Sequence, residues 1–563
     1  MSANALNLPD QLDLIASTPE GIQKLRGLIL ELAVRGKLVP QDPNDEPASE
    51  LLKRIAKERA RLEAEGVCKK SKATPLCTKD APPFELPAGW VLSQLSDLTL
   101  VLNGRAYAKD ELLSEGVPVL RVGNLFTSNH WYYSNLQLED DKYCDQGDLL
   151  YSWSASFGPF IWQGQKVIYH YHIWKLRLFD ESSLSKEYFY KFLLEKTAEI
   201  KAAGHGVSMI HMTKEKMEKI LVPVPPLAEQ HRIVAKVDEL MALCDDLEEK
   251  VGAGETAHAK LVDNLLGTLT QSTDAAELAA NWQRLAKHFD SLFTTESSLD
   301  ALKQTILQLA VMGKLVPQDP NDEPASELLK RIAKERAQLE AEGKIKKSKP
   351  MTQVSPDEEP FVLPEGWSWV RFNDLINPES PISYGVLVPG PDVPDGIPFV
   401  RLGDLDIENP PAKPEKSISV EVDKQYGRTR LAGGEILMGV VGSIGKLGIA
   451  PSSWKGANIA RAVCRIEPIH PIDRRFIVRL LQSQFMQTSF VGDTRTLAQP
   501  TLNVGLIREA VTPLPPLAEQ QRIVAKVDEL MVLCDGLKAK VGAGRTAQER
   551  LAATLIETAL KAA

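Results

Sequence analysis

The residues whose types could do chemistry do not complete a catalytic motif. Asn409-Pro410-Pro411-Ala412 comes closest to the motif that holds a flipped-out base, in which an amide or acidic residue and two prolines precede an aromatic ring. An alanine cannot stack on a base, so we interpret this stretch as a turn. The sequence therefore predicts no base-modifying site.

Neither a phosphate-binding loop nor a metal site is expected. Gly445-Lys446-Leu447 lacks the first glycine and the hydroxyl of a GxxxxGK[ST] loop. Cys68 and Cys77 are not followed by a second pair of ligands. Five histidines fall within one segment without ligand spacing, which favours surface or stacking roles: His130, His170, His172, His205 and His211.

A sequence repeat indicates the elements that would position any binding residues. Residues 225–254 and 515–544 agree at 25 of 30 positions. A proline suited to a first helical turn (Pro226, Pro516) and an early glutamate begin each copy. Each copy is expected to start a helix of about 45 residues, about 67 Å long at 1.5 Å per residue. Its weak point is a Gly-Ala-Gly triplet (252–254, 542–544), where a bend or break would fall.

Apolar residues in both copies follow a 4-3-4-3-4 spacing, the seam of a coiled coil. Continuing the count reaches Leu261 and Leu265 in one copy and Leu551 and Leu555 in the other. An ordinary buried helix would also show an apolar stripe, but two matching narrow seams favour mutual pairing. The expected helix-pairing residues are Ile233, Val237, Leu240, Cys244, Leu247, Val251, Ile523, Val527, Leu530, Cys534, Leu537 and Val541.

A second repeat lies upstream of each helix. Residues 36–66 recur as 313–343 with one change, Arg61 to Gln338. Each copy combines a turn, QDPNDEP, with a short amphipathic helix, then a polar linker, then an LPxGW stretch ending at Trp90 or Trp367. Beyond that point the halves diverge, although VPVLRVGNL (117–125) still matches IPFVRLGDL (397–405).

These boundaries predict an alternation of frame, mixed domain and long helix. We expect a helical frame with linker (1–83), a mixed α/β domain (84–224), a long helix (225–275), a second frame with linker (276–360), a second mixed domain (361–514) and a second long helix (515–563). Two different domains on a repeated scaffold suit the reading of two different targets at a fixed separation.

The composition fits an ordinary soluble protein. The 563 residues are 43% hydrophobic and 25% charged, enough for several domains with substantial cores. Six cysteines without regular spacing indicate reduced thiols. The first residues lack a signal-peptide pattern, and no run approaches eighteen apolar residues. We expect a cytoplasmic protein that is neither exported nor membrane-spanning.

The chain resembles the specificity subunits of type I DNA restriction-modification systems. The residues that carry the resemblance are the PPLAEQxRIVAKVDELM motif, the GKLVPQDPNDEPASELL motif, the LPxGW stretches and the two-domain layout. The resemblance spans the whole chain. It implies an α+β fold in which two target recognition domains are joined by two long antiparallel, coiled-coil-like helices with an internal pseudo-two-fold repeat. It also suggests that the N-terminal frame and the C-terminal helix together complete what the central region contains contiguously.

The resemblance also implies a function without chemistry of its own. Each target recognition domain would read one half of a split, asymmetric DNA site. The paired helices would set the spacer and dock methyltransferase subunits, which restriction and translocase subunits join. The chain itself is expected to bind no cofactor, whereas S-adenosylmethionine, ATP and Mg²⁺ would bind to the partner subunits.

The net charge of −9 and the pI of about 5.7 argue mildly against a nucleic-acid partner. The second mixed domain is neutral, however, and Arg, Asn and Gln side chains suit base edges. The candidates for DNA contact are Arg105, Arg121, Asn124, Ser152, Trp153, Ser154, Lys166, His211, Arg401, Asp404, Arg428, Arg430, Ser443, Lys446, Arg495 and Gln499. Each could instead be an ordinary solvated side chain. Glycines 439, 442 and 445 would serve either a tight turn or close approach of the backbone to DNA.

Polar residues that both helices share off the seam are expected to bind partners. They are Glu229, Gln230, Arg232 and Lys236 in one copy and Glu519, Gln520, Arg522 and Lys526 in the other. Near identity between the copies predicts two identical methyltransferase subunits, one per repeat. The rival hypotheses are a coiled-coil adaptor with two protein-binding domains, which the acidic pI favours slightly, and a self-sufficient enzyme, which the missing motifs disfavour.

Overall fold

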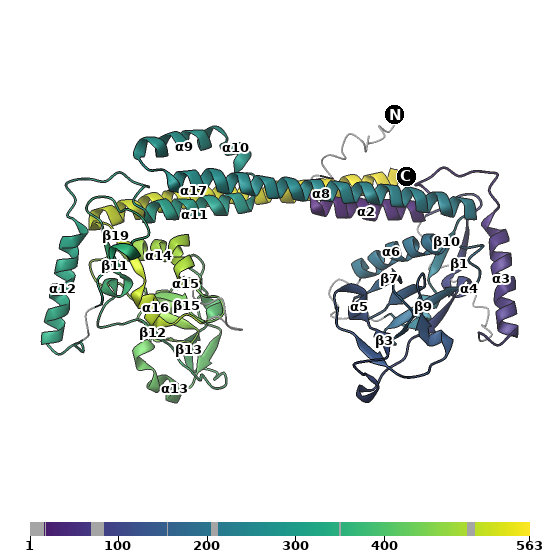
Figure 1. Cartoon of the computed structure of the whole chain (residues 1–563), viewed down its shortest axis with the longest axis horizontal. Coiled ribbons are helices and arrows are strands. Elements are labelled where there is room, and N and C mark those ends of the chain that lie inside the picture. The colour runs from purple at the N-terminus through teal and green to yellow at the C-terminus, as the bar shows by residue number, and fades with distance from the viewer. Residues whose placement is uncertain are drawn as a thin grey trace. The chain divides into compact units, whose positions relative to one another are not determined.

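The structure, a computed structural model, describes residues 16, 18–68, 84–154, 156–203, 212–347, 351–491 and 501–562. The chain forms two compact units: unit 1 comprises Met1–Glu255 and Arg545–Ala563, and unit 2 comprises Thr256–Gly544. The division falls within both long helices, α8 (Leu227–Gln271) and α17 (Leu517–Ala562) (Figure 1). Among the described residues, no helix is long and apolar enough to cross a membrane.

Unit 1 contains a frame of three packed helices. They are α2 (Pro19–Val34), the first part of α8 and the last part of α17. Thr18 caps α2 by accepting a hydrogen bond from the backbone N–H of Gly21 at 3.1 Å. Arg26 of α2 forms an ion pair with Asp245 of α8 at 2.5 Å, and Lys24 Nζ donates to the carbonyl of Glu549 of α17 at 3.0 Å. A further helix, α3 (Ala48–Ala64), follows α2.

Unit 2 contains the corresponding frame. Here α11 (Glu296–Val311) packs with the first part of α17 and the last part of α8, and α12 (Ala325–Ala341) follows it. Lys538 of α17 forms an ion pair with Asp300 of α11 at 2.7 Å, and Lys314 Nζ donates to the carbonyls of Thr270 and Ser272 at 2.8 Å. Two helices without a counterpart in the described part of unit 1, α9 (Ala275–Lys287) and α10 (Phe289–Leu292), connect α8 to α11.

Each frame therefore joins one short helix to parts of both long helices. The N-terminal α2 lies with the end of α17 as α11 lies with the end of α8, which is the complementation that the resemblance suggested. The structure divides the predicted seam residues between the two units. Ile233, Val237 and Cys244 are buried in the core of unit 1, whereas Ile523, Val527 and Cys534 are buried in the core of unit 2. Leu240, Leu247 and Val251, and Leu530, Leu537 and Val541, are partly buried against the same two cores.

The two seams therefore meet through their continuations: Leu555 of α17 packs against the core that holds Ile233, and Leu265 of α8 packs against the core that holds Ile523. Because the long helices are antiparallel, each seam packs against the short helix of its unit and the far end of the other long helix. Past the glycines the heptad count holds in part: Leu265 and Leu555 are partly buried against the cores, whereas Leu261 is 50% exposed and Leu551 is 49% exposed. Val262, Leu266 and Ile556 are buried there instead, because a straight helix drifts about 20° per heptad.

Head 1 (residues 84–224) holds two four-stranded sheets, with strand orders β2-β9-β6-β7 and β4-β3-β8-β5. The helix α6 packs Phe189 and Phe192 into the core that includes the first sheet. The strands are β2 (Thr99–Asn103), β3 (Val117–Leu120), β4 (Tyr132–Ser134), β5 (Tyr143–Cys144), β6 (Leu149–Ser152), β7 (Gly158–Ile161), β8 (Val167–Tyr169) and β9 (Ile173–Leu178). The helices are α4 (Leu95–Leu98), α5 (Val122–Phe126), α6 (Lys186–Ala203) and α7 (Lys214–Glu218).

Head 2 (residues 361–514) repeats the first sheet as β12-β18-β15-β16, and its second sheet, β14-β13-β17, repeats all but the β5 strand of head 1. In both heads one parallel pair, β3 with β8 or β13 with β17, lies in an otherwise antiparallel arrangement. The strands are β12 (Ser383–Tyr384), β13 (Ile397–Val400), β14 (Lys416–Ile418), β15 (Ile436–Gly439), β16 (Leu447–Ile449), β17 (Asn458–Ile459) and β18 (Val463–Ile466). The helices are α13 (Val420–Gln425), α14 (Arg474–Gln482), α15 (Gln484–Val491) and α16 (Val504–Glu509).

A two-stranded ribbon closes each head at the frame. Strand β1 (Val91–Gln94), directly after Trp90, pairs with β10 (Leu221–Val224), which leads into α8. Strand β11 (Ser368–Arg371) pairs in the same register with β19 (Val511–Leu514), which leads into α17. Both ends of each head therefore return to one point of its frame.

Both long helices run unbroken through their Gly-Ala-Gly triplets. A Cβ added at Gly252 or Gly254 would meet nothing within 4 Å.

Replacing both glycines by alanine should therefore raise the free energy of unfolding by roughly 1 kcal/mol per site, measured by chemical denaturation. Gly36→Ala is the matched control and should destabilise, because its φ is +67° and the Cβ would lie 2.5 Å from Pro87. Destabilisation by Gly252→Ala would contradict a continuous helix.

Candidate nucleic-acid interface

Four segments of head 1 meet at the turn between β8 and β9, residues 170–172. The backbone N–H of His170 donates to Leu120 O at the end of β3 at 2.9 Å. Arg105, just past β2, donates to Tyr169 O and accepts from Tyr171 N–H, both at 3.0 Å. Trp153, just past β6, donates through its backbone to His172 O at 3.2 Å. The turn is fixed by residues far apart in sequence.

Aromatic side chains crowd this turn. The Trp153 ring stacks on Trp174 with 5.7 Å between centroids and meets His172 edge-on at 5.1 Å. Its Nε1 donates to Tyr171 O at 2.9 Å. Tyr171 remains 39% exposed. The prediction placed Trp153 on a loop facing DNA, and the structure places it in a loop cluster, where it supports the exposed Tyr171.

The three basic residues predicted to contact DNA in head 1 each lie beside an aromatic ring. Arg105 pairs with Glu111 through both terminal nitrogens, at 2.9 and 2.7 Å. Arg121 is exposed at the end of β3 with its guanidinium 5.0 Å from the Tyr132 ring centroid. Lys166, also exposed, lies over Tyr143 at 4.8 Å. Arg121 and Lys166 are exposed, whereas the Arg105 guanidinium would have to leave Glu111 before it could bind another group.

His170 is held neutral at neutral pH. Burial lowers its pKa to about 4, and the charges of His172 and Arg121 act in the same direction. A neutral imidazole offers one donor and one acceptor nitrogen. The cluster therefore combines hydrogen-bonding capacity with stacking surface, and its positive charge comes from arginine and lysine.

Three other candidates in head 1 have internal roles or lie elsewhere. Ser152 is fully buried, and its hydroxyl donates to Ser154 O at 3.3 Å, so the prediction of DNA contact is wrong for Ser152. Asn124 caps α5: its Oδ1 accepts from Arg121 N–H at 3.1 Å and its Nδ2 donates to His130 O at 2.8 Å. This cap starts the short helix α5 directly after β3 ends at Leu120. His211 lies outside the described residues.

Head 2 reproduces the hydrogen bonds of this turn with other side chains. Ala460 N–H donates to Val400 O at 2.9 Å, and Val440 N–H donates to Ala462 O at 2.8 Å. Val386 donates to Ile459 O at 2.7 Å and accepts from Arg461 N–H at 2.9 Å. Arg461 is exposed at the tip. Neither Arg461 nor Tyr171 was among the predicted contacts.

Several predicted residues of head 2 already have partners. Arg401 pairs with Glu415 at 2.9 Å, and Arg430 forms an ion pair with Asp423. Asp404 is buried and accepts from Arg401 N–H at 2.7 Å, so the prediction of DNA contact is wrong for Asp404. Arg428, Ser443 and Lys446 are exposed, the last donating through Nζ to Leu402 O at 3.1 Å. Arg495 and Gln499 lie outside the described residues.

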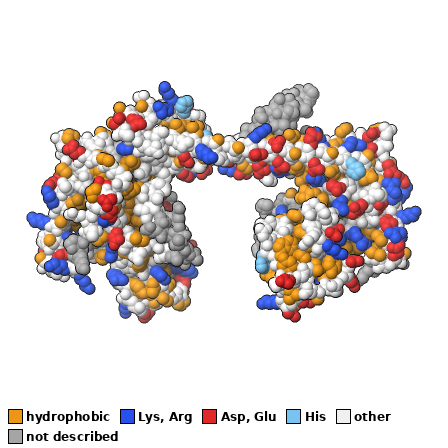
Figure 2. All heavy atoms as spheres, in the orientation of Figure 1, with side chains coloured by type: hydrophobic (Ala, Val, Ile, Leu, Met, Phe, Trp, Pro, Cys, Tyr) orange, Lys and Arg blue, Asp and Glu red, His pale blue; other side chains and the backbone are white. Residues whose placement is uncertain are grey.

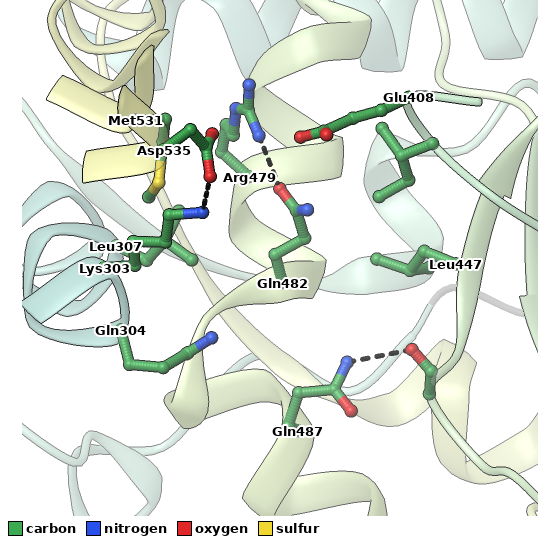
Figure 3. Close-up of a pocket in the computed structure, with 12 residues that line it drawn as sticks. Lys303, Gln304, Leu307, Glu408, Leu447, Arg479, Gln482, Gln487, Met531 and Asp535 are labelled. Atoms are coloured by element: carbon green, nitrogen blue, oxygen red, sulfur yellow. Dashed lines mark hydrogen bonds and ion pairs between the residues drawn. The ribbon is translucent and has the colours of Figure 1, made fainter. Parts of the chain in front are cut away.

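The turn between β15 and β16 explains the glycines near Lys446. A Cβ at Gly439 would lie 2.5 Å from Ser443 O, and Gly442 and Gly445 have φ of +81° and +79°. A tight turn therefore accounts for all three. Gln487 of α15 donates to Gly445 O at 3.2 Å from the wall of a cavity of about 400 Å³, shown in Figure 3. The cavity also contains the Lys303–Asp535 ion pair, which joins α11 to α17.

The described parts of the heads hold no cluster of metal ligands, and the face of them shown in Figure 2 has no broad basic surface. Within the described segments, no group of three or more His, Cys, Asp or Glu side chains is placed to hold a metal ion. On the face shown in Figure 2, basic and acidic side chains are interspersed over both units.

Four of the polar residues expected to bind partners instead fasten each head to its frame: Glu229, Gln230, Glu519 and Gln520. Glu229 is 1% exposed; its Oε1 accepts from Gln41 Nε2 and its Oε2 from Trp90 Nε1, both at 3.0 Å. Gln230 is fully buried; its Oε1 accepts from Ser185 N–H at 2.7 Å and its Nε2 donates to Pro225 O at 2.9 Å. We call the Gln41–Glu229–Trp90 contact the clamp of unit 1.

Unit 2 has the same clamp. Glu519 accepts from Gln318 Nε2 at 3.0 Å and from Trp367 Nε1 at 2.9 Å. Gln520 is fully buried, and its Oε1 accepts from Asp473 N–H at 3.1 Å. Beside the clamps, Arg232 pairs with Asp45 and Arg522 with Asp322, each at 2.6 Å.

The prediction of partner contact is therefore wrong for Glu229, Gln230, Glu519 and Gln520, because they are buried inside the chain. Arg232 and Arg522 already pair with the QDPNDEP turns. Lys236 and Lys526 stay partly exposed, in pairs with Glu239 and Glu529. Near identity between the copies has an intramolecular cause: three repeated motifs converge on one set of contacts.

A carboxylate is required at the clamp because each of its oxygens accepts from a different donor. Glu229→Gln would set an NH₂ group against one of those donors and should lower the free energy of unfolding by about 1–3 kcal/mol. Glu519→Gln should have a similar effect. Lys236→Gln, on the exposed side of α8, is the control and should change stability little. Equal stability of Glu229→Gln and Lys236→Gln would refute the clamp.

Two heads of one topology, closed onto matching frames and exposing different side chains on matching turns, define a two-headed recognition protein. The family model described as the type I restriction modification DNA specificity domain matches residues 87–253 and 383–541. These matches cover more than half of the chain, and the chain belongs to this family. It is a specificity subunit with two DNA specificity domains, and it is not an enzyme.

Two named relatives match this chain over nearly their whole length. The chain is 38% identical to the specificity subunit of type I restriction enzyme EcoAI from Escherichia coli, over 96% of this chain and 94% of the relative. It is 37% identical to the EcoEI specificity subunit, also from Escherichia coli, over 96% and 94%. The solved structure of the HsdS subunit from Thermoanaerobacter tengcongensis is 18% identical, over 85% of this chain and 98% of its own, with a TM-score of 0.34.

Proposed function

We propose that each head reads one half of a split, asymmetric DNA site and that the paired long helices set the spacer between the halves. One observation carries this proposal: the heads share a backbone arrangement down to individual hydrogen bonds, yet expose different side chains at the matching turns. Duplicated heads with the same side chains would read the same sequence twice. Different side chains on the same frame suit an asymmetric site.

Exchange of a head tests this proposal. Residues 84–222 are replaced by the corresponding segment of another specificity subunit, and methylated adenines are mapped in cells that carry the complete system. One half-site should change while the other half and the spacer stay the same. Replacing residues 361–512 is the matched experiment and should change the other half. A change in both halves, or in neither, would contradict separate reading.

The partners follow from the same family. We propose two identical methyltransferase subunits, joined by restriction and translocase subunits in the full complex, in the cytoplasm. S-adenosylmethionine, ATP and Mg²⁺ would bind to those partners, while this chain contributes recognition and spacing.

An exposed stripe that both long helices repeat is the proposed methyltransferase docking surface. On α8 it comprises Lys236, Glu239, Leu243 and Lys250, whose spacings of 3, 4 and 7 put them on one helix face. Lys526, Glu529, Leu533 and Lys540 are the same residues on α17. Leu243 is 51% exposed and Leu533 is 58% exposed. A solvated helix face gains nothing from an exposed leucine at the same place in both copies, whereas a docked subunit would bury it.

Leu243→Asp and Leu533→Asp should each remove one methyltransferase from the assembled methylase, because burying a carboxylate against an apolar surface is costly. Native mass spectrometry of the complex gives the count directly, and the double variant should lose both subunits. Leu506→Asp, at a 41% exposed position on α16, is the control. Two bound methyltransferases in the double variant would rule out this surface.

A further inference from the structure

The turns at 170–172 and 460–462 occupy one backbone position in two heads. Both close a four-residue turn, with Ile173 N–H donating to His170 O and Val463 N–H to Ala460 O, each at 2.9 Å. In both heads the backbone at the turn lies so close to a glycine after the neighbouring strand that no side chain would fit there. A Cβ at Gly104 would lie 2.3 Å from His170 O, and one at Gly385 would lie 1.8 Å from Ile459 O. The hydrogen bonds therefore identify equivalent residues where the sequences no longer align.

The side chains that this shared backbone carries differ almost completely between the two heads. His170, Tyr171 and His172 of head 1 correspond to Ala460, Arg461 and Ala462 of head 2. The supporting residues change as well, from Arg105 to Val386 and from Trp153 to Val440. By contrast, Arg121 and Arg401 keep one residue type after β3 and β13 and begin a short helix in the same way. An arginine common to both heads suits contact with phosphate, which carries no sequence information.

We propose that the tripeptides 170–172 and 460–462 determine which bases each head reads and that Arg461 reads a guanine. This inference rests on the proposed function, in which the two heads read different half-sites. Two heads with the same backbone but different side chains at these turns could read two different half-sites.

Arg461 is the arginine of head 2 best prepared for this role. Its backbone is held by Val386, and its flanking alanines offer no competing polar group. Across the described residues, its guanidinium makes no hydrogen bond or ion pair, whereas Arg401 and Arg430 pair with acidic residues. A free guanidinium can donate two hydrogen bonds to O6 and N7 of guanine. The neighbouring Leu387 and Val388, 56% and 71% exposed, suit apolar contact with a thymine methyl group.

Tyr171 holds the same position in head 1 with different chemistry. Its ring packs against His172, with 4.0 Å between centroids, and lies 6.2 Å from Trp153. A supported aromatic ring with a hydroxyl can stack or form one hydrogen bond but cannot make the bidentate contact of arginine. The two heads should therefore prefer different bases at the equivalent position.

Methylated adenines are mapped in cells whose native gene is replaced by Arg461→Ala or by Tyr171→Ala. Arg461→Ala should weaken discrimination roughly 5- to 150-fold at one guanine of one half-site, so that this position becomes degenerate. Tyr171→Ala should alter only the other half-site. Arg475→Ala, whose side chain is 66% exposed on α14, is the control and should leave the motif intact. Thermal unfolding of each full-length variant verifies that the fold is retained.

The inference is overturned if a folded Arg461→Ala variant keeps the wild-type motif, if the relaxed position is not a guanine, or if both substitutions change the same half-site. Failure of the proposed function would look different. In that case the unmodified chain itself would direct methylation to no split motif.

Discussion

The rest of the structure depends on a buried carboxylate that ties three segments together in each unit. Glu229 stands in the first turn of α8, where it accepts from Gln41 of the QDPNDEP turn and from Trp90 at the start of head 1. Burial raises the pKa of Glu229 and of Glu519, and the donor hydrogen bonds act in the opposite direction. A buried carboxylate is costly unless both oxygens are satisfied, and here each has its donor. The contact therefore fixes helix, turn and head at one point.

Because the clamp occurs twice, the heads are free to diverge. The ribbons β1–β10 and β11–β19 return both ends of each head to its clamp, so changes inside a head need not disturb the frame. Because the long helices are antiparallel, the frame of unit 1 includes the end of α17 and the frame of unit 2 includes the end of α8. Duplication thus preserves the geometry of attachment, while the exposed turns carry different side chains.

Much of the frame could be predicted from the sequence because it rests on local patterns. The expected helix length of about 45 residues agrees with the 45 residues of α8, and both copies of the helix start within two residues of the predicted point. The short helices that cover the seams could not be predicted, because spacing shows that a helix has a narrow apolar face but not which helix covers it. The roles of Glu229 and Gln230 were missed for a similar reason: polar residues that match between copies suggest a shared surface until their burial is known.

The DNA-contact residues named from the sequence stay predictions, and the structure shows only which of them are exposed and which are buried. Arg121 and Trp153 were named from side-chain type, and both lie at the loop cluster. Tyr171 and Arg461, which we propose as base-reading residues, could not be singled out from the sequence because hydrogen bonds between residues far apart in sequence define their turns. The sequence does align VPVL with IPFV, and this alignment makes Leu120 equivalent to Val400. The equivalence of the two turns follows only from the pairing of those strands with β8 and β17, which the sequence does not show.

Mapping of methylated adenines in a genome, with and without this gene, tests the central claim most directly. The account predicts that one split, asymmetric motif loses its methylation when the gene is deleted and regains it when the gene is restored. Unchanged methylation at every motif, although the chain is expressed and assembled with its partners, would contradict the claim that the two heads read DNA.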